Sequence, residues 1–137
     1  MVYIIRREHF SAAHRLFLPG YTDEENFEVF GKCSNPNWHG HNYILYITIK
    51  GEVDPRTGLI IHLSHVSKLI KEKILNKVDH KNLNIEVDFL AGKVPTSEII
   101  AIGIWNELKQ EIKNLGAELH CVRLEQSENN IIEYFGE

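Results

Sequence analysis

Hydrophobic and polar residues alternate over residues 2–15, and this period of two predicts a long β-strand. The alternation places His14 on the same face of the strand as Phe10 and Ala12. Residues 41–51 are rich in β-branched and aromatic side chains, which predicts a second strand. Two shorter strands are predicted near the end of the chain, at about 117–126 and 130–135.

Two segments between the second and third strands have hydrophobic residues at the spacing of a helix. The first covers about residues 64–77, and Ser64 is its predicted N-cap. The second begins after Thr96, a candidate cap, and ends at Gly116. We therefore expect two amphipathic helices, each with one apolar side to bury.

The connection between the first two strands, about residues 18–37, is long for a compact domain. Its middle, residues 23–30, predicts a short helix that Thr22 or Asp23 would cap. A loop of this length that carries unusual residues is more often a functional site than a spacer.

The predicted order is strand, long loop, strand, helix, helix, strand, strand, in a single domain over residues 1–137. Short turns between strands favour an antiparallel sheet, and the two helices are expected to cover one of its faces. The fold class is therefore α+β, with a four-stranded antiparallel sheet. Because a sheet this small leaves two edges and one broad face uncovered, we expect an oligomer whose sheets join edge to edge.

The composition is that of a soluble globular protein, with 43% hydrophobic and 25% charged residues. The net charge of −4 gives no support to a nucleic-acid-binding surface. No apolar run approaches the roughly 18 residues that span a bilayer, and the N-terminus lacks the order of parts of a signal peptide. Two cysteines are too few for a disulfide framework. We therefore expect a cytoplasmic protein.

Two of the eight histidines form the sequence His39-Gly40-His41 at the start of the second strand. Residues two apart on a strand point the same way, so these imidazoles could share a metal ion, although they could also be ordinary surface histidines. His14 could lie beside them across the sheet and supply a third ligand. Three neutral imidazoles with a fourth position open are the ligand set of a catalytic zinc site.

Cys33 precedes this pair in the long loop and has two interpretations. As a fourth ligand it would close a structural zinc site, whereas as a thiolate beside a metal or an imidazolium it would serve as a base or nucleophile. Asp79 and His80 follow the first helix and could form a proton shuttle. The pattern alone favours the simpler interpretation of a helix-end Asp beside a solvated His.

Four further polar residues have both a structural and a binding interpretation. Glu125 lies in an otherwise apolar strand, where it either forms a salt bridge with Arg123 or accepts hydrogen bonds from a ligand. Thr96 and Glu98 suit the first turn of a helix, as a cap and as a charge that complements the helix dipole. The backbone N–H groups around Ser97 could also receive a polar ligand.

Five segments, in this order along the chain, resemble the signature of the 6-pyruvoyl-tetrahydropterin synthase family. They are Phe10–Leu16, Cys33–Tyr43, Asp79–Leu83, Thr96–Glu98 and Glu125–Ile131. Each is moderately specific alone, but the five together are highly specific, and the likeness covers nearly the whole chain.

The resemblance implies the tunnelling fold (T-fold), a four-stranded antiparallel sheet with two helices on one face. In this fold three subunits form a barrel and two trimers stack into a homohexamer with sites at subunit interfaces. It also implies one Zn²⁺ per subunit. The implied roles are zinc ligation by His14, His39 and His41, proton abstraction by Cys33, a proton relay through Asp79 and His80 of a neighbouring subunit, and pterin binding by Glu125, Thr96, Ser97 and Glu98.

The family substrate is 7,8-dihydroneopterin triphosphate, which the pyruvoyl enzymes convert to 6-pyruvoyl-5,6,7,8-tetrahydropterin with triphosphate elimination, as in tetrahydrobiopterin biosynthesis. Zinc would acidify the C–H bonds beside the side-chain hydroxyls for a thiolate base. The resemblance thus implies a zinc-dependent lyase. Sister branches make 6-carboxy-5,6,7,8-tetrahydropterin in queuosine-type biosynthesis or cleave the side chain for folate. Alternatives of other classes are a non-catalytic zinc- or pterin-binding module and a zinc hydratase or hydrolase.

Five residues separate Cys33 from His39, which resembles the pyruvoyl branch. The carboxy branch typically has a shorter gap, and the folate-linked branch typically has Glu where Cys33 stands. Trp38 departs from the pattern, since the family usually has Gly there, and a bulky ring could reshape the mouth of the pocket. His62 and His65 also depart, at positions usually given to Asn or Asp.

Overall fold

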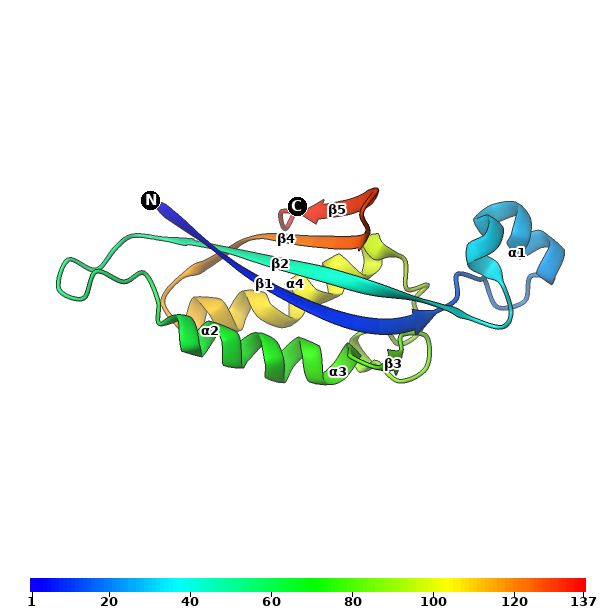
Figure 1. Ribbon diagram of the computed structural model, residues 1–137, viewed down its shortest axis with the longest axis horizontal. Coiled ribbons are helices and arrows are strands. Elements are labelled where there is room, and N and C mark those ends of the chain that lie inside the picture. Colours follow the sequence, from blue (N-terminus) through cyan, green and yellow to red (C-terminus); the bar gives the residue numbers. More distant parts are fainter.

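The computed structural model describes all 137 residues as one sheet with helices along it (Figure 1). The strands are β1 (Val2–His14), β2 (His39–Gly51), β3 (Lys81–Asn82), β4 (Glu118–Ser127) and β5 (Asn130–Tyr134). The helices are α1 (Asp23–Phe30), α2 (Leu63–Ile70), α3 (Asn76–Val78) and α4 (Ser97–Asn114), with a π-helical segment at Lys71–Leu75 between α2 and α3 and 3₁₀ turns at Gly31–Ser34 and Asp88–Leu90. None of the helices is long and apolar enough to cross a membrane.

The sheet has the strand order β3-β1-β2-β4-β5, and its four longer strands pair antiparallel, as predicted. The short strand β3 pairs parallel with β1, so the sheet is mixed and five-stranded, and the prediction of a purely four-stranded antiparallel sheet is wrong in this respect. Long-range hydrogen bonds hold β3 in place: the N–H of His80 donates to Ser11 O (2.6 Å) and that of Leu83 to Ala13 O (2.8 Å). A two-residue strand has no hydrophobic period that a sequence could reveal.

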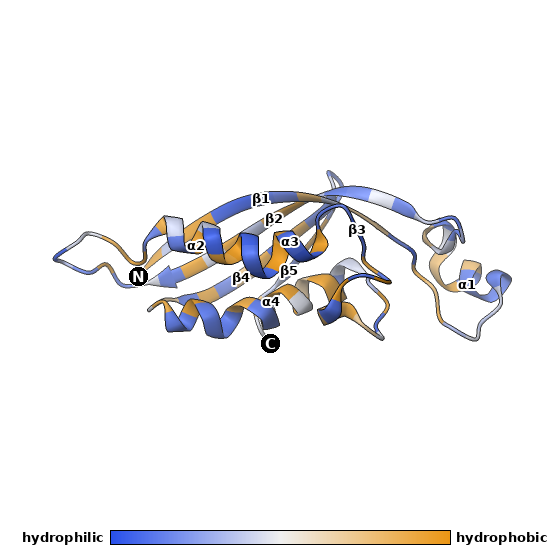
Figure 2. Cartoon of the chain, turned by 90° about the horizontal axis from the view of Figure 1, so that it is seen from below, coloured by the Kyte–Doolittle hydropathy of each residue, from blue (hydrophilic) through white to orange (hydrophobic).

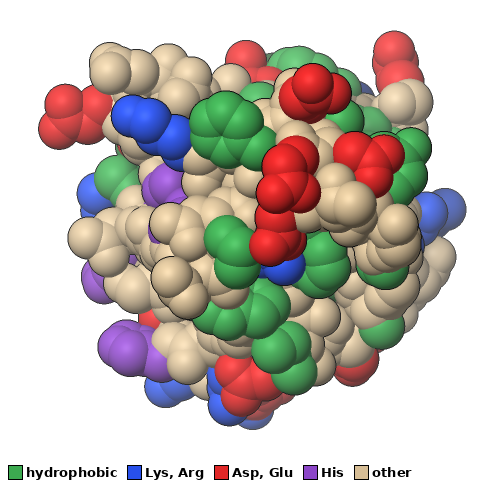
Figure 3. Space-filling model, turned by 90° about the vertical axis from the view of Figure 1, so that its right-hand side faces the viewer, with side chains coloured by type: hydrophobic (Ala, Val, Ile, Leu, Met, Phe, Trp, Pro, Cys, Tyr) green, Lys and Arg blue, Asp and Glu red, His purple; other side chains and the backbone are tan.

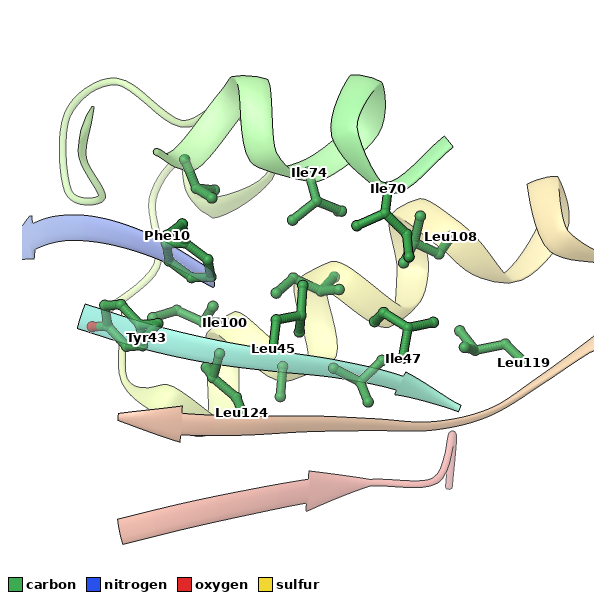
Figure 4. Close-up of a cluster of buried hydrophobic side chains, with 14 of the residues drawn as sticks. Phe10, Tyr43, Leu45, Ile47, Ile70, Ile74, Ile100, Leu108, Leu119 and Leu124 are labelled. Atoms are coloured by element: carbon green, nitrogen blue, oxygen red, sulfur yellow. The ribbon is translucent and has the colours of Figure 1, made fainter. Parts of the chain in front are cut away.

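Both long helical segments cover the same face of the sheet (Figure 2), as the sequence predicted. The alternate residues of β2 that point toward them are fully buried, among them Leu45, Ile47 and Ile49. They join Ile70, Leu108 and other apolar side chains in a core of 23 buried residues (Figure 4). Full burial of each such side chain contributes about 1.5–3 kcal/mol, so this face is what holds the helices to the sheet.

The long connection between β1 and β2 carries α1 at one end of the molecule (Figure 1). Thr22 caps α1, with its side chain accepting from the N–H of Glu25 while the Glu25 side chain accepts from the N–H of Thr22. The buried Asn26 accepts from the N–H of Leu18 (2.8 Å), which ties α1 back to the start of the loop. The loop is therefore an ordered structure whose ends stay together.

The caps of the two long helical segments agree only partly with the sequence prediction. Thr96 caps α4 as predicted, since its Oγ1 accepts from the N–H of Ile99 at 3.2 Å. The prediction of Ser64 as the cap of α2 is wrong. His62 is the cap, and its Nδ1 accepts from the N–H of Ser64 at 3.2 Å. Imidazole nitrogen is an uncommon capping acceptor, which is why the residue ranking favoured serine.

Candidate metal centre and active site

Three histidines meet where β1 ends and β2 begins. The antiparallel register places His14 directly opposite His39, and His41 two residues further along β2 points to the same, helix-covered side. The ring centroids lie 4.5 Å apart for His14 and His39, 5.1 Å for His14 and His41, and 5.0 Å for His39 and His41. One nitrogen from each ring lies within 4.8 Å of the other two. The strand alternation thus brings together the three histidines that the sequence singled out.

His14 is held in a defined orientation by the segment before α4. Its Nδ1 lies 2.9 Å from the carbonyl oxygen of Pro95, to which it donates, so its Nε2 is the acceptor that faces the other two rings. Burial lowers the pKa of His14 to about 4, and the neighbouring His39 and His41 lower it further, against the effect of Pro95. His14 is therefore neutral at neutral pH, the form that can bind a metal ion.

The polar atoms of this cluster fit a metal ion. His14 Nε2, His41 Nε2 and both ring nitrogens of His39 are buried and have no hydrogen-bond partner. Burial also lowers the pKa values of His39 and His41, which keeps both rings neutral. Buried polar atoms without partners are costly, whereas three neutral imidazoles are a zinc-type donor set. The Pro95 carbonyl is the outer partner that such a ligand usually has.

Tyr43 lies beside this cluster, two residues beyond His41 on the same face of β2. Its ring stacks on Phe10 at 4.8 Å and lies 5.5 Å from the ring of His41. The side chain is fully buried, and its hydroxyl has no hydrogen-bond partner. Burial, and to a smaller extent the nearby Cys33, raises the pKa of Tyr43, so the hydroxyl is neutral. Sequence reasoning missed both Tyr43 and Pro95, although the strand period places Tyr43 on the histidine side.

Cys33 lies in the 3₁₀ turn that precedes β2 and is half-buried. Its carbonyl accepts from the N–H of Leu16 (2.9 Å), which anchors the turn just after β1 ends. The side chains close enough to share one ion are the three histidines without Cys33. This arrangement favours an open three-histidine site over a closed site with the thiol as fourth ligand.

Asp79 and His80 lie at the edge of the sheet, beside Ser11 of β1. Asp79 Oδ1 accepts from the N–H of Ser11 (2.9 Å) and lies 3.1 Å from His80 Nδ1. The Ser11 hydrogen bond is the main cause that lowers the pKa of Asp79, and the contact with His80 lowers it further. His80 and His41 both line an open pocket of about 460 Å³ at this edge. Asp79 and His80 thus lie at this pocket, whose strand residues Ser11, Ala13 and Asn42 alternate with the helix-facing positions that carry the three histidines.

Glu125 lies away from the cluster, on the opposite face of the sheet. It pairs with Ile44 in the β2–β4 register, and Ile44 alternates with the buried, helix-facing Tyr43 and Leu45. Arg123 Nη2 lies 3.7 Å from Glu125 Oε1, so the predicted salt bridge is present. Within one chain the structure does not bring Glu125 to the three histidines.

The three residues at the start of α4 differ in what they contact. Thr96 is the cap described above, Glu98 is exposed in the first turn, and Ser97 is buried, with its hydroxyl donating to Gln126 Oε1 at 2.6 Å. This segment directly follows Pro95, whose carbonyl holds His14. The cap and dipole roles are therefore both met here, and the segment also holds the ring of His14 in place.

The two residues with a positive φ other than glycines both flank this site. Trp38, directly before His39, has φ 68°, and His80 has φ 60°. This left-handed region costs about 1–2 kcal/mol for a residue with a side chain. This cost is a physical reason why glycine, which has no side chain, suits position 38. At both positions the surrounding hydrogen bonds hold the backbone in place, from Trp38 N–H to Asn35 O and from His80 N–H to Ser11 O.

Charged groups around this end of the molecule also fasten the long loop. Arg15, directly after His14, donates to the carbonyl of Ser34 (2.7 Å), pairs with Asp23 (3.2 Å) and packs over the ring of Phe17 (4.3 Å). Figure 3 shows this end face, where acidic and hydrophobic side chains mix and histidines gather along one side. Arg15 therefore holds α1 and the Cys33 turn against the end of β1.

The chain matches known proteins over most or nearly all of its length. A family model described as 6-pyruvoyl tetrahydropterin synthase matches residues 3–137. The 6-pyruvoyl tetrahydrobiopterin synthase of Pongo abelii is 46% identical over 134 residues, 98% of this chain and 91% of that protein. The 6-carboxy-5,6,7,8-tetrahydropterin synthase of Bacillus subtilis is 30% identical over 119 residues, 85% of this chain and 71% of that protein. The structure of Caenorhabditis elegans 6-pyruvoyl tetrahydropterin synthase matches with a TM-score of 0.91 and 41% identity, covering 99% of this chain and 96% of that one.

Proposed function

The chain belongs to the 6-pyruvoyl tetrahydropterin synthase family, and from this premise we propose that it acts as a zinc-dependent lyase on 7,8-dihydroneopterin triphosphate. Its function is that of a 6-pyruvoyl-tetrahydropterin synthase, which eliminates triphosphate and forms 6-pyruvoyl-5,6,7,8-tetrahydropterin. The observation that carries the zinc dependence is the cluster of three neutral imidazoles at the end of β1 and the start of β2, which bury ring nitrogens that have no hydrogen-bond partner.

His14, His39 and His41 would hold the zinc ion. When bound there, zinc supplies a Lewis acid that withdraws charge from hydroxyl oxygens on the substrate side chain and so acidifies the adjacent C–H bonds. The protein's own contribution is to keep the three rings neutral and aimed at one point. The hydrogen bond from His14 Nδ1 to the Pro95 carbonyl supports this for His14, since it fixes the tautomer and the ring orientation.

Cys33 is the proposed base that removes a proton from the substrate side chain. Cys33 is half-buried in the turn before β2, and its backbone is anchored to Leu16. Asp79 and His80, from a neighbouring subunit, are the proposed partners that return a proton. The Ser11 N–H holds Asp79 charged and in place, and the 3.1 Å contact orients the His80 ring.

Glu125 is the proposed anchor for the pterin ring, helped by Thr96, Ser97 and Glu98. Because Glu125 lies on the opposite sheet face from the histidines, a site that uses both needs a second copy of the chain. This requirement supports the proposed trimeric barrel, two of which would stack into a homohexamer with sites between subunits. The cytoplasm is the proposed location of the enzyme.

The proposed product is that of the pyruvoyl branch of the family. The sequence is 46% identical to the 6-pyruvoyl relative and 30% identical to the 6-carboxy relative. A cysteine at position 33, separated from His39 by five residues, also fits the pyruvoyl pattern. Both observations support a 6-pyruvoyl product.

The experiment that tests this function is product identification by mass spectrometry. Zinc-loaded protein would be incubated without oxygen with 7,8-dihydroneopterin triphosphate, and triphosphate release would be measured in parallel. A 6-pyruvoyl product is expected. A 6-carboxy or 6-hydroxymethyl product would move the chain to a sister branch, and tight pterin binding without turnover would indicate a non-catalytic module.

The role of Cys33 is tested by Cys33→Ala, with Cys121→Ala as the matched control at the other, buried cysteine. Loss of a positioned base lowers turnover by about 10²–10⁴-fold, whereas zinc content should stay at the wild-type level. The control should keep both zinc and activity. Full activity of Cys33→Ala would remove the thiol from the mechanism, and loss of zinc in that variant would make it a metal ligand.

A further inference from the structure

The packing of Tyr43 fixes where its hydroxyl lies. The ring is sandwiched at the end of the core, stacked on Phe10 with an interplanar angle of 15° and edge-on to His41 and His14 at 5.5 Å and 6.2 Å. In Figure 4 the hydroxyl oxygen points away from the aliphatic side chains, toward the end of the sheet where β1 ends and β2 begins. That end is the location of the three-histidine cluster. The fixed ring thus aims its polar tip at the proposed metal centre.

The hydroxyl has no partner within the chain, although Tyr43 is 0% exposed. Leaving a buried donor unsatisfied is unfavourable, and phenylalanine would fill the same space without that cost. One metal ion would take one nitrogen from each histidine and would still leave the Tyr43 oxygen without a partner. The oxygen therefore has a hydrogen-bonding capacity that neither the fold nor the ion uses.

We propose that the Tyr43 hydroxyl is a substrate-positioning group, which hydrogen-bonds a hydroxyl oxygen of the pterin's polyol side chain when that side chain sits at the three-histidine centre. This inference rests on the proposed function, because it takes the ligand to be a dihydroneopterin. A donor held rigidly by ring stacking favours one placement of the side chain, and this placement would set which C–H bond faces Cys33. Tyr43 thereby selects the reacting carbon without taking a proton itself.

The test uses Tyr43→Phe, which keeps the ring and its stacking on Phe10 and removes only the oxygen. Tyr134→Phe is the matched control, because Tyr134 packs edge-on against Trp105 on the helix-covered side of the sheet, in β5. Thermal unfolding would be recorded for each protein without metal, with Zn²⁺, and with Zn²⁺ plus 7,8-dihydroneopterin. This pterin carries the polyol side chain but lacks the triphosphate leaving group, so it binds without elimination.

We expect Tyr43→Phe without metal to unfold at the wild-type temperature or above it, because an unpaired buried hydroxyl has been removed. The shift caused by Zn²⁺ should equal that of the wild type. Affinity for 7,8-dihydroneopterin should fall by about 3–10-fold, the effect of one lost hydrogen bond. The value of kcat with the triphosphate substrate should fall by more than the affinity does, because the lost contact sets the placement of the reacting carbon. The control should match the wild type in every measurement.

Three results would overturn the inference. A variant that unfolds several degrees lower without metal would show that the hydroxyl has a partner in the fold. A tenfold loss of Zn²⁺ affinity would assign the oxygen to the ion. Wild-type affinity for 7,8-dihydroneopterin together with wild-type kcat would show that the oxygen has no ligand. The wild-type protein distinguishes failure of this inference from failure of the proposed function. If the proposed function fails, 7,8-dihydroneopterin will not shift the unfolding temperature of the wild-type protein. If only this inference fails, the shift will still be present.

Discussion

The two halves of the β1–β2 pair, on the side that faces the helices, are built from the same strands yet differ in chemistry. In the apolar half, toward the end of β2, Leu45, Ile47 and Ile49 are fully buried and belong to the hydrophobic core. In the polar half, where β1 ends and β2 begins, His39, His41 and Tyr43 bury nitrogen and oxygen atoms that have no hydrogen-bond partner. Both halves bury side-chain atoms, but only the polar half buries atoms that lack hydrogen-bond partners.

The difference shows how a small domain divides one strand pair between stability and function. Apolar burial stabilises the fold in proportion to the area removed from water, whereas unpaired polar atoms destabilise it until a ligand supplies their partners. Stability should therefore depend on the apolar half, and activity on the polar half. The four predictions that follow test this division, from the largest expected effect to the smallest.

Replacing one metal-site histidine should have the largest effect, and it should fall on activity. We expect His39→Ala to lower turnover by at least about 10³-fold, because the proposed zinc ion would lose one of its three ligands and with it the position from which it would acidify the substrate. The free energy of unfolding of the metal-free protein should change by no more than about 1 kcal/mol, since the ring nitrogens of His39 make no hydrogen bond in the fold. Turnover, zinc content and denaturant unfolding are the measurements. A large loss of metal-free stability would contradict the division.

A substitution in the apolar half should do the opposite. Ile47→Ala removes three buried carbon atoms from the centre of the core and should lower the free energy of unfolding by about 2–5 kcal/mol. At a temperature where the variant is still folded, its zinc content should equal that of the wild type. Denaturant unfolding and metal analysis test this together. Loss of zinc in a folded Ile47→Ala protein would show that the halves are coupled.

Acid should destabilise the metal-free protein through the polar half. In the unfolded chain His14 titrates near its ordinary value of 6.5, whereas in the fold its pKa is lowered to about 4. Above pH 6.5 both states are neutral; between 6.5 and 4 only the unfolded chain takes up the proton. Stability should therefore fall as pH falls through this window, by ~3 kcal/mol in all. Denaturant unfolding measured from pH 7.5 to 4 checks this. His14→Leu should remove the part of the slope that belongs to His14 and leave the part from His39 and His41, whose pKa values burial also lowers.

The smallest effect concerns the backbone that leads into the polar half. Trp38→Gly and Trp38→Ala both remove the indole ring, so the difference between them reports the positive φ of 68° alone. We expect the Gly variant to be more stable by about 0.5–1 kcal/mol, because the strain of Ala at this φ exceeds the greater entropy that Gly loses on folding. Equal stability, measured by thermal unfolding, would mean that the backbone relaxes when the ring is removed.

Much of the fold and of the site follows from local patterns in the sequence. The strand period of two already places His14 with Phe10 and sets His39 and His41 on one side, and the structure brings these three rings together. Helical spacing likewise predicted both long helical segments, and Thr96 was identified as a cap. Period and capping are short-range effects, so a single sequence is enough to read them.

Other features depend on contacts between distant residues, and only the tertiary structure decided them. The parallel strand β3 exists because of hydrogen bonds from residues 80 and 83 to β1, and the carbonyl that orients His14 comes from Pro95, 81 residues away. The same holds for the unpaired hydroxyl of Tyr43 and for the position of Glu125 on the opposite face. A sequence determines which side of a strand a residue takes, because that depends on its neighbours. Which group it then meets depends on how the whole chain packs.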